Sequence, residues 1–255
     1  MSGALLATGL GILLGESNMK LNKFGINFEW LDQRYNPALD LDPVLTLGGT
    51  RVGQAFYRKF GKRLMDLTLV ALCAPLLITL LPPLIALVAM DRGNPFYSQI
   101  RLGQNGRPFR MWKLRSMVPD AENLLQAHLA ACPEAREEWE RDQKLKNDPR
   151  ITKVGLFIRK ASLDELPQFW NVITGDMSVI GPRPMLETQR ALYPGNDYYL
   201  LRPGITGLWQ ITVRNESSFA ERAHFDSLYN ACLSFKTDLK ILLATVLVVC
   251  SCTGH

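Results

Sequence analysis

An adjacent pair of carboxylates, Asp164 and Glu165, is the part of the sequence best suited to chemistry on phosphates. A carboxylate side chain can attack phosphorus and form an acyl-phosphate. A neighbouring carboxylate can hold Mg²⁺, which usually binds one or two carboxylates together with substrate phosphates. The pair therefore predicts a phosphoryl-transfer site in which one carboxylate is the nucleophile and the other is the metal ligand.

The same residues also fit a purely structural explanation. The segment SLDE matches a capping box, with Ser162 at the N-cap of a helix and Glu165 at its N3 position. Taken alone, this explanation is the better supported one, but it does not exclude chemistry. A helix N-terminus stabilises anions, so we expect it to keep Asp164 ionised and available as a nucleophile.

Basic residues near this pair could bind phosphate oxygens. Arg159 precedes Asp164 by five residues, and Arg183 lies in the segment GPRP, where prolines restrict the backbone on both sides. Arginine can bind a phosphate through two parallel hydrogen bonds. Lys113 and Arg115 could bind either a substrate or lipid headgroups. The alternative for Arg183 is a solvated side chain on a surface turn.

Residues 67–90 form an uncharged segment long enough to reach across a bilayer. As a straight helix its 24 residues would measure ~36 Å, against a hydrocarbon core of ~30 Å. Both flanks are basic, which favours the cytoplasmic side for each. The flanking basic residues are Arg51, Arg58, Lys59, Lys62 and Arg63 before the segment, and Arg101, Arg107, Arg110, Lys113 and Arg115 after it.

Prolines interrupt this apolar segment at Pro75, Pro82 and Pro83. A proline inside a helix removes a hydrogen bond and kinks the helix. Together with the basic flanks, the break at Ala74-Pro75 predicts a re-entrant hairpin with limbs of residues 60–74 and 76–90, each ~22 Å long. The alternative is a kinked single crossing.

The remaining elements predict an α-rich α+β fold. Residues 119–146 have helical patterning, with Pro133 opening a second helix, and short strands are expected near residues 96–100 and 109–114. The apolar run 241–250 is too short to cross a bilayer, so it is either an interfacial helix or a plain core helix. We expect an N-terminal extension (1–55), a membrane hairpin (56–92) and a catalytic domain (93–255).

Composition adds few constraints. The net charge is +5 and the pI is about 9.0, which suit an anionic membrane or phosphate-rich substrates. Five scattered cysteines and three distant histidines predict neither a disulfide framework nor a zinc site. A reducing cytosol is therefore expected around the part outside the membrane.

Several blocks in order resemble one known family, the monotopic polyprenyl-phosphate phosphoglycosyl transferases, also called bacterial sugar transferases. The blocks span residues 59–251 and read KRLMD, KLRSM, RKASLDELPQFWNVITGDMSVIGPRP, RPGITGLWQ and FDSLY…DLKIL. Within the family the sequence is most similar to the undecaprenyl-phosphate galactose phosphotransferases that prime succinoglycan-type exopolysaccharides. Such enzymes are monotopic, with a re-entrant hairpin and the catalytic domain on the cytoplasmic face of the bacterial inner membrane.

The resemblance implies a reaction and assigns roles. Asp164 attacks the phosphate that bears the sugar in a UDP-sugar, UMP leaves, and undecaprenyl phosphate then takes the sugar-phosphate from the enzyme. Glu165 binds Mg²⁺, while Arg159, Arg183 and Lys113 match positions linked to substrate phosphates or nucleotide. Galactose is preferred over glucose, and an inactive membrane scaffold of the same fold is the alternative. Membrane lipids and a second copy of the chain are further expected partners, and no nucleic acid is.

Two positions depart from the family pattern. The serine of the Ser-Pro pair that breaks the hairpin is replaced by Ala74, so only Pro75 is left to break it. A Gly-Arg-Asn block becomes Val213-Arg214-Asn215, and valine does not easily adopt a positive φ. A substrate-binding role for Arg214 therefore depends on a loop of different conformation.

Overall fold

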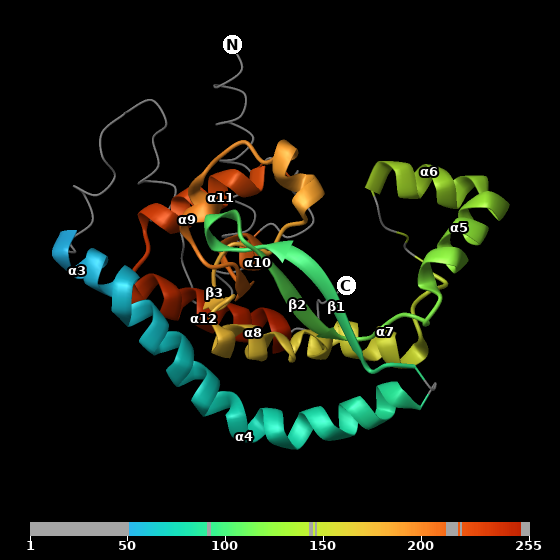
Figure 1. The fold of residues 1–255 in the computed structure, drawn as a ribbon, viewed down its shortest axis with the longest axis horizontal. Coiled ribbons are helices and arrows are strands. Elements are labelled where there is room, and N and C mark those ends of the chain that lie inside the picture. Colours follow the sequence, from blue (N-terminus) through green and yellow to red (C-terminus); the bar gives the residue numbers. More distant parts are fainter. Residues whose placement is uncertain are drawn as a thin grey trace, which may run out of the picture. The chain divides into compact units, whose positions relative to one another are not determined.

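A computed structural model describes residues 51–90, 93–142, 145, 147–212, 219 and 221–250 of the chain (Figure 1). The predicted N-terminal extension thus lies outside the described residues except for its last five positions. The described part begins with three consecutive helical segments: α3 (Arg51–Phe56), a π-helical turn (Tyr57–Gly61) and α4 (Lys62–Ala89).

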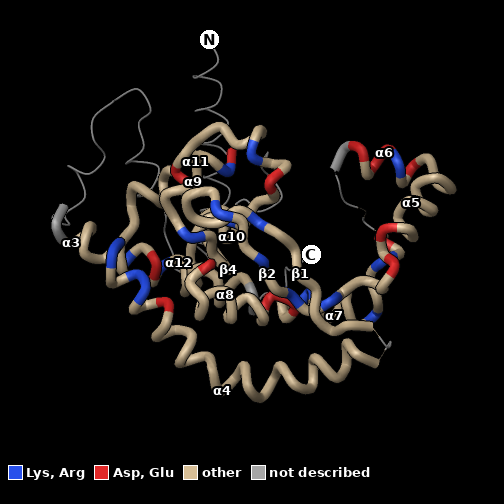
Figure 2. The backbone as a smooth tube through the Cα atoms, in the orientation of Figure 1, with Lys and Arg blue, Asp and Glu red and all other residues tan. Residues whose placement is uncertain are grey.

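Helix α4 carries the long apolar segment. It is one helix from Lys62 to Ala89, although Pro75, Pro82 and Pro83 inside it donate no backbone hydrogen bond. The predicted break at Ala74-Pro75 therefore lies within the helix and does not end it. Beyond Asp66 the helix has no charged residue, as the uniformly tan tube in Figure 2 shows. By length and composition, the helical stretch Gly53–Ala89 is the one described helix able to cross a membrane. A long apolar helix, as predicted, is therefore present.

The described strands form two small sheets. β1 (Phe96–Leu102) and β2 (Pro108–Leu114) form a hairpin, close to the two strands predicted from the sequence. The turn between them holds Asn105 and Gly106 at positive φ. β3 (Ser178–Ile180) and β4 (Gly204–Thr206) pair in parallel, with Ser178 opposite Gly204 and Ile180 opposite Thr206. Helices outnumber strands throughout, which agrees with the α-rich α+β prediction.

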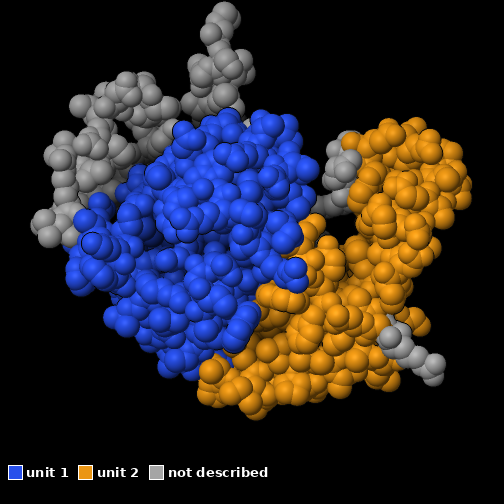
Figure 3. All heavy atoms as spheres, in the orientation of Figure 1, with its two compact units in different colours: residues 1–73, 100–111, 168–251 blue, residues 74–99, 112–167, 252–255 orange. Residues whose placement is uncertain are grey.

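The chain divides into two compact units, each assembled from separate stretches of sequence (Figure 3). Unit 1 contains the described residues of 1–73, 100–111 and 168–251. Unit 2 contains those of 74–99, 112–167 and 252–255. The division falls inside α4, directly before Ala74-Pro75, and also inside both strands of the hairpin.

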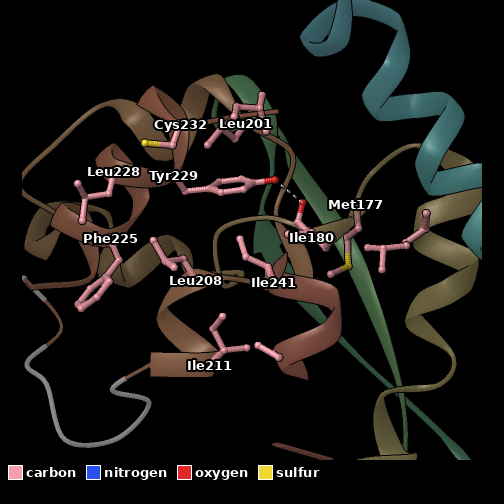
Figure 4. Packing of buried hydrophobic residues seen from close by; sticks show 14 of the residues in the cluster. Met177, Ile180, Leu201, Leu208, Ile211, Phe225, Leu228, Tyr229, Cys232 and Ile241 are labelled. Carbon is pink, nitrogen blue, oxygen red and sulfur yellow. Dashed lines mark hydrogen bonds between the residues drawn. The ribbon is translucent and has the colours of Figure 1, made fainter. Parts of the chain in front are cut away.

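Unit 1 is built around one large apolar cluster (Figure 4). It is enclosed by α8 (Gln168–Thr174), α9 (Asp197–Leu200), α10 (Leu208–Thr212), α11 (Glu221–Ala231) and α12 (Phe235–Cys250). The Tyr229 ring crosses the cluster, and its hydroxyl oxygen lies 3.2 Å from the carbonyl oxygen of Ile180. In α12, Ile241 and Ala244 are fully buried. Leu239, Leu243 and Val246 of the same helix are exposed, so one face of α12 packs in the core and the other is apolar and open. Both alternatives for residues 241–250, interfacial helix and core helix, stay predictions.

A buried polar cluster ties α4 to this core. Lys62 forms an ion pair with Asp238 of α12, at 2.8 Å, and Asp238 also accepts a hydrogen bond from the Tyr229 hydroxyl. One turn further along α4, Asp66 accepts from the hydroxyl of Ser178 and from the backbone N–H of Val179. Asp238 is fully buried, so the ion pair lies inside unit 1.

Unit 2 contains two smaller apolar clusters. α5 (Ala121–Ala131) and α6 (Pro133–Asp142) confirm the two helices predicted in this region, with Pro133 as the first residue of the second. They pack through Leu125, Leu129 and Ala135. The other cluster joins the second half of α4 to β2 and to α7 (Lys153–Lys160); its members are Leu84, Val88, Leu114 and Ile158.

Candidate active site

Asp164 lies in a single 3-10 turn, Leu163–Glu165, between α7 and α8. Ser162 has φ 55° and ψ 22°, a left-handed conformation, and its side chain caps nothing. The predicted capping box is therefore wrong. Ser162 ends α7, because its N–H donates to the carbonyl of Arg159, and the next helix begins only after Pro167. Asp164 is buried in this turn, with 8% of its surface exposed.

The charge of Asp164 is balanced by a lysine from another part of the chain. Burial raises the pKa of Asp164, while Lys113 lowers it and Glu165 raises it. The Lys113 Nζ lies 3.7 Å from Asp164 Oδ2 and 2.6 Å from Glu165 Oε1. The expectation that a helix N-terminus keeps Asp164 ionised is wrong, because the residue sits in a 3-10 turn and the net pKa shift is upward. Lys113 provides the stabilising charge instead.

Strand β2 positions Lys113. Its neighbours along the strand, Met111 and Leu114, are buried in apolar clusters, which fixes the strand and the direction of the side chains between them. The Lys113 side chain is 22% exposed and that of Glu165 is 27% exposed. Both charges are thus largely but not completely removed from water, where an ion pair is stronger than at an open surface.

Arg159 stands in the last turn of α7 and is oriented by Ser116. Its Nε donates to the Ser116 Oγ at 2.8 Å. Among the described residues, its two terminal nitrogens form no hydrogen bond or ion pair. Burial lowers the pKa of Arg159, and Asp164 raises it. The guanidinium is therefore held at one nitrogen and presents the other two to a ligand.

The position of α7 depends on a very close contact. A Cβ on Gly155 would lie 1.9 Å from the carbonyl oxygen of Ser116, so only glycine allows this approach. The helix begins beside it, where the Thr152 side chain accepts from the N–H of Gly155 and the Thr152 N–H donates to the Ser116 carbonyl. The same serine thus contacts both ends of α7, which sets where Arg159 lies.

Arg183 belongs to unit 1, whereas Asp164, Glu165, Lys113 and Arg159 share unit 2. Its segment, GPRP, packs directly on the segment RPGITG. Gly181 N–H donates to the Thr206 carbonyl, and Gly204 N–H donates to the Pro182 carbonyl, each at 2.8 Å. A Cβ on Gly181 would lie 2.3 Å from the carbonyl of Arg202. The segments GPRP and RPGITG are therefore joined backbone to backbone beside the β3–β4 pair, and we call this contact the glycine junction.

The Arg183 side chain is exposed at this junction. Its guanidinium carbon lies 5.7 Å from the centre of the Trp209 ring, and the structure gives it no hydrogen bond or ion pair with any described residue. An arginine over an aromatic ring and without a carboxylate partner is suited to binding an anion.

The other predicted site residues are placed differently. Arg115 donates from Nε to the carbonyl of Asn94 and from Nη2 to that of Val88, so it holds the segment that follows α4. Its assignment to substrate or lipid remains a prediction. Arg214 and its neighbour Val213 lie outside the described residues. Ala74 and Pro75 lie within α4.

Sequence reasoning missed three residues that organise these side chains. Ser116 orients Arg159, Trp209 faces Arg183, and Arg222 lies behind the same ring. Ser116 and Trp209 fall in blocks already singled out, KLRSM and RPGITGLWQ, so the motifs did contain a signal. Arg222 has no local signal, because the ring and carbonyl partners of its guanidinium lie at least 13 residues away except for Phe219.

The donor set can be compared with the needs of Mg²⁺. The described residues contain no group of three or more His, Cys, Asp and Glu side chains that could hold a metal ion. Mg²⁺ commonly takes only one or two carboxylates and completes its shell with phosphate oxygens and water. Adjacent Asp164 and Glu165, partly open to solvent, fit that smaller requirement.

Comparisons with known proteins show the family to which the sequence belongs. The sequence model of the family described as bacterial sugar transferase matches residues 57–252. The chain is 48% identical over 193 residues to the UDP-galactose-lipid carrier transferase of Erwinia amylovora, covering 75% of this chain and 40% of that protein. It is 44% identical over 197 residues to the undecaprenyl-phosphate galactose phosphotransferase of Salmonella typhimurium, covering 75% and 40%.

A shorter relative is matched over most of its length. The exopolysaccharide production protein ExoY of Rhizobium meliloti is 43% identical over 190 residues, covering 72% of this chain and 84% of the relative. The chain thus spans about two fifths of the first two relatives and most of the third. The family match includes α4, the Asp164-Glu165 pair, Arg159 and the junction that carries Arg183. The chain belongs to the bacterial sugar transferase family.

Proposed function

We propose that the protein transfers a hexose-1-phosphate, preferentially galactose-1-phosphate, from a UDP-sugar to undecaprenyl phosphate and releases UMP. This would be the first step in assembling the repeat unit of an exopolysaccharide. Three relatives support this reaction class by their names: a UDP-galactose-lipid carrier transferase, an undecaprenyl-phosphate galactose phosphotransferase and an exopolysaccharide production protein.

The observation that carries the proposal is the setting of Asp164. It is a buried carboxylate facing an ammonium, beside a second carboxylate and an arginine whose terminal nitrogens are available. A structural ion pair would need only one acid and one base. Two adjacent acids that share a lysine retain negative charge, which a metal-bound diphosphate can use.

In the first step, an ionised oxygen of Asp164 attacks the β-phosphorus of the UDP-sugar. A bond forms between Asp164 and phosphorus, and the bond from that phosphorus to the bridging oxygen of the diphosphate breaks. UMP leaves with the electron pair, and the sugar-phosphate remains on the enzyme as an acyl-phosphate. Arg159 and Arg183 would bind phosphate oxygens, and Lys113 would stabilise the charge near the reacting group.

In the second step, a phosphate oxygen of undecaprenyl phosphate attacks the same phosphorus. The bond between Asp164 and phosphorus breaks, and the carboxylate is restored. The product is an undecaprenyl diphosphate that carries the sugar. Each step replaces one oxygen substituent of the same phosphorus by another, so the reaction needs no oxidant and no water.

Mg²⁺ would be held by Glu165 together with the diphosphate oxygens. When bound, it would neutralise charge on the diphosphate and so favour departure of UMP. Glu165 pairs with Lys113 at 2.6 Å. Lys113 therefore occupies the position of a counterion for the carboxylate.

The lipid substrate requires a membrane location. We propose that α4 enters the bacterial inner membrane as a re-entrant hairpin broken at Pro75, with the catalytic units on the cytoplasmic face. The basic residues on both sides of the apolar segment support the same side for both flanks. Membrane lipids are then partners of the apolar side chains exposed on α4, among them Leu72, Leu76 and Ile78.

A panel of UDP-sugars, with purified protein, Mg²⁺ and undecaprenyl phosphate, tests the proposal. UMP should appear, most rapidly with UDP-galactose, and UDP-sugar alone should give a sugar-phosphate adduct on Asp164. Release of UDP would indicate a glycosyl transfer instead. Faster turnover with UDP-glucose would assign glucose in place of galactose and leave the proposed reaction unchanged. Absence of turnover with every nucleotide sugar would favour an inactive scaffold.

A further inference from the structure

We propose that Arg222 is a positioning residue that holds Arg183 in the conformation that binds a phosphate group of the nucleotide substrate. The inference rests on the proposed function for its ligand, but the contacts that carry it lie wholly within unit 1. Arg222 stands on α11 and Arg183 follows β3, 39 residues earlier in the sequence.

The two arginines are joined by the chain itself. Nη2 of Arg222 donates a hydrogen bond to the backbone carbonyl of Arg183. Pro182 and Pro184 limit φ on either side, and Pro182 also accepts from the N–H of Gly204. The backbone at Arg183 is thus held from one side by the glycine junction and from the other by Arg222.

The two guanidinium groups also share one aromatic ring. The centre of the Trp209 ring lies 5.7 Å from the guanidinium carbon of Arg183 and 5.3 Å from that of Arg222. Arg222 lies 4.8 Å from the centre of the Phe219 ring as well. Cation–π contacts at these distances orient a guanidinium plane without using its hydrogen-bond donors. Arg183 keeps its donors available as a result.

Exposure divides the roles between the two residues. Arg222 is 6% exposed, so it is poorly placed to reach a nucleotide itself. Arg183 is exposed and has no ionic partner among the residues that the structure describes. Burial lowers the pKa of Arg222, Asp226 raises it, and the like charge of Arg183 lowers it. Two neighbouring guanidinium groups repel each other, so an anion that binds at the exposed Arg183 reduces this repulsion.

Fixing a flexible arginine before the ligand arrives reduces the entropy lost on binding. Arginine has several rotatable bonds, and an exposed one would otherwise sample many rotamers. The ligand class follows from the donor geometry: a planar pair of N–H groups matches two oxygens of a phosphate. In the proposed reaction that phosphate belongs to the nucleoside diphosphate.

The test compares Arg183→Met, Arg222→Met and the double variant with the intact protein. For each, kcat and KM are measured from UMP release, and the melting temperature is measured with and without UDP. We expect Arg222→Met to lower kcat/KM about tenfold, chiefly through KM, as loss of a hydrogen bond to a charged group would. The double variant should have the same kcat/KM as Arg183→Met. Once the Arg183 side chain is gone, Arg222 has nothing left to position.

Three further variants separate positioning from folding. Arg222→Gln keeps an N–H donor for the Arg183 carbonyl and Arg222→Lys keeps the charge, so each should recover part of the lost affinity. Arg190→Met is the matched control, since Arg190 also lies 5.7 Å from an aromatic ring, that of Tyr199, in the same unit. A lower melting temperature with unchanged KM in all the Arg222 variants would show a purely structural role and overturn the inference.

The outcomes also distinguish the two proposals. If the fold-losses in kcat/KM of Arg183→Met and Arg222→Met multiply in the double variant, the two residues act independently. That result would contradict the positioning role of Arg222 even if UMP is released. If the intact protein releases no UMP, the proposed function fails, but stabilisation by UDP still decides the inference. Equal loss of that stabilisation in both single variants and the double variant would support it. Stabilisation that persists without Arg222 would overturn it.

Discussion

Lys62 and Asp238 form an ion pair of 2.8 Å between the first residue of α4 and a fully buried position of α12. The pair is reinforced by two hydroxyl groups, those of Tyr57 and Tyr229, which both donate to the Asp238 carboxylate. The helix that we propose to enter the membrane is therefore anchored in the core of unit 1 by charge as well as by apolar packing.

Removing the lysine should destabilise unit 1. Lys62→Met leaves Asp238 and the nearby Asp66 without their shared cation, and an uncompensated buried charge typically costs about 3–5 kcal/mol. Chemical denaturation should show this loss. Lys59→Met, at an exposed position three residues earlier, should change stability by less than about 0.5 kcal/mol. Equal effects of the two variants would contradict the anchoring role.

Asp164→Asn should abolish turnover, because an amide cannot form the acyl-phosphate. Mass spectrometry should find no adduct after incubation with UDP-galactose, while the fraction of protein bound to membranes should not change. The control is Asp120→Asn, which alters an exposed carboxylate of the same unit. An adduct on another side chain of the Asp164→Asn variant would rule out the assigned nucleophile.

Activity should rise with pH across the range in which Asp164 ionises. Burial raises the pKa of this carboxyl, so a larger part of the population is protonated and inactive below neutral pH than for an ordinary aspartate. Lys113 opposes this shift. Lys113→Met should therefore move the acidic limb of the profile of kcat/KM against pH to higher pH. An acidic limb at the same pH in both proteins would show that another group titrates there.

The glycine junction should be sensitive to a single methyl group. Gly181→Ala places a Cβ 2.3 Å from the Arg202 carbonyl, so the loop that carries Arg183 must move. We expect a loss of about 1–3 kcal/mol in stability together with a higher KM for the UDP-sugar. Gly195→Ala is the control, because its nearest contact would be an ordinary 3.5 Å. An unaltered KM in Gly181→Ala would separate this loop from substrate binding.

Asp226 gives the protein a pH-dependent stability. Burial raises its pKa to about 7, although the Tyr193 hydroxyl and Arg222 lower it. The folded protein retains this proton while the unfolded chain, with a pKa near 3.9, releases it. Stability from this group is thus complete below about pH 4 and is lost as pH rises to about 7, by at most ~4 kcal/mol. Asp226→Asn should flatten the dependence in denaturation curves between pH 4 and 8; an unchanged slope would contradict it.

Local pattern was sufficient for the larger elements. The apolar segment of α4, the break between α5 and α6 at Pro133, and the strands of the hairpin all follow from residue types within a few positions. The Asp164-Glu165 pair was recognisable for the same reason, since both acids stand side by side. Arg159, Arg183 and Lys113 were candidates because they are basic residues in or near the same motifs, and the family blocks include the same three positions.

What failed depended on contacts between distant residues. A capping box was expected at Ser162, but this residue adopts a left-handed conformation and its side chain forms no cap hydrogen bond. The cation facing Asp164 comes from a strand 51 residues earlier, and no local rule reports it. β3 and β4 have only three residues each, too few for a periodic signal, and they pair across 26 positions.

The way the chain is distributed between the two units has a practical consequence. Helix α4 and both strands of the β1–β2 hairpin pass from one unit to the other, so the backbone crosses the boundary several times. No single cut can yield a fragment that contains all of one unit and none of the other. Truncation is therefore a poor way to dissect this protein, and its parts are best probed by point substitutions in the intact chain.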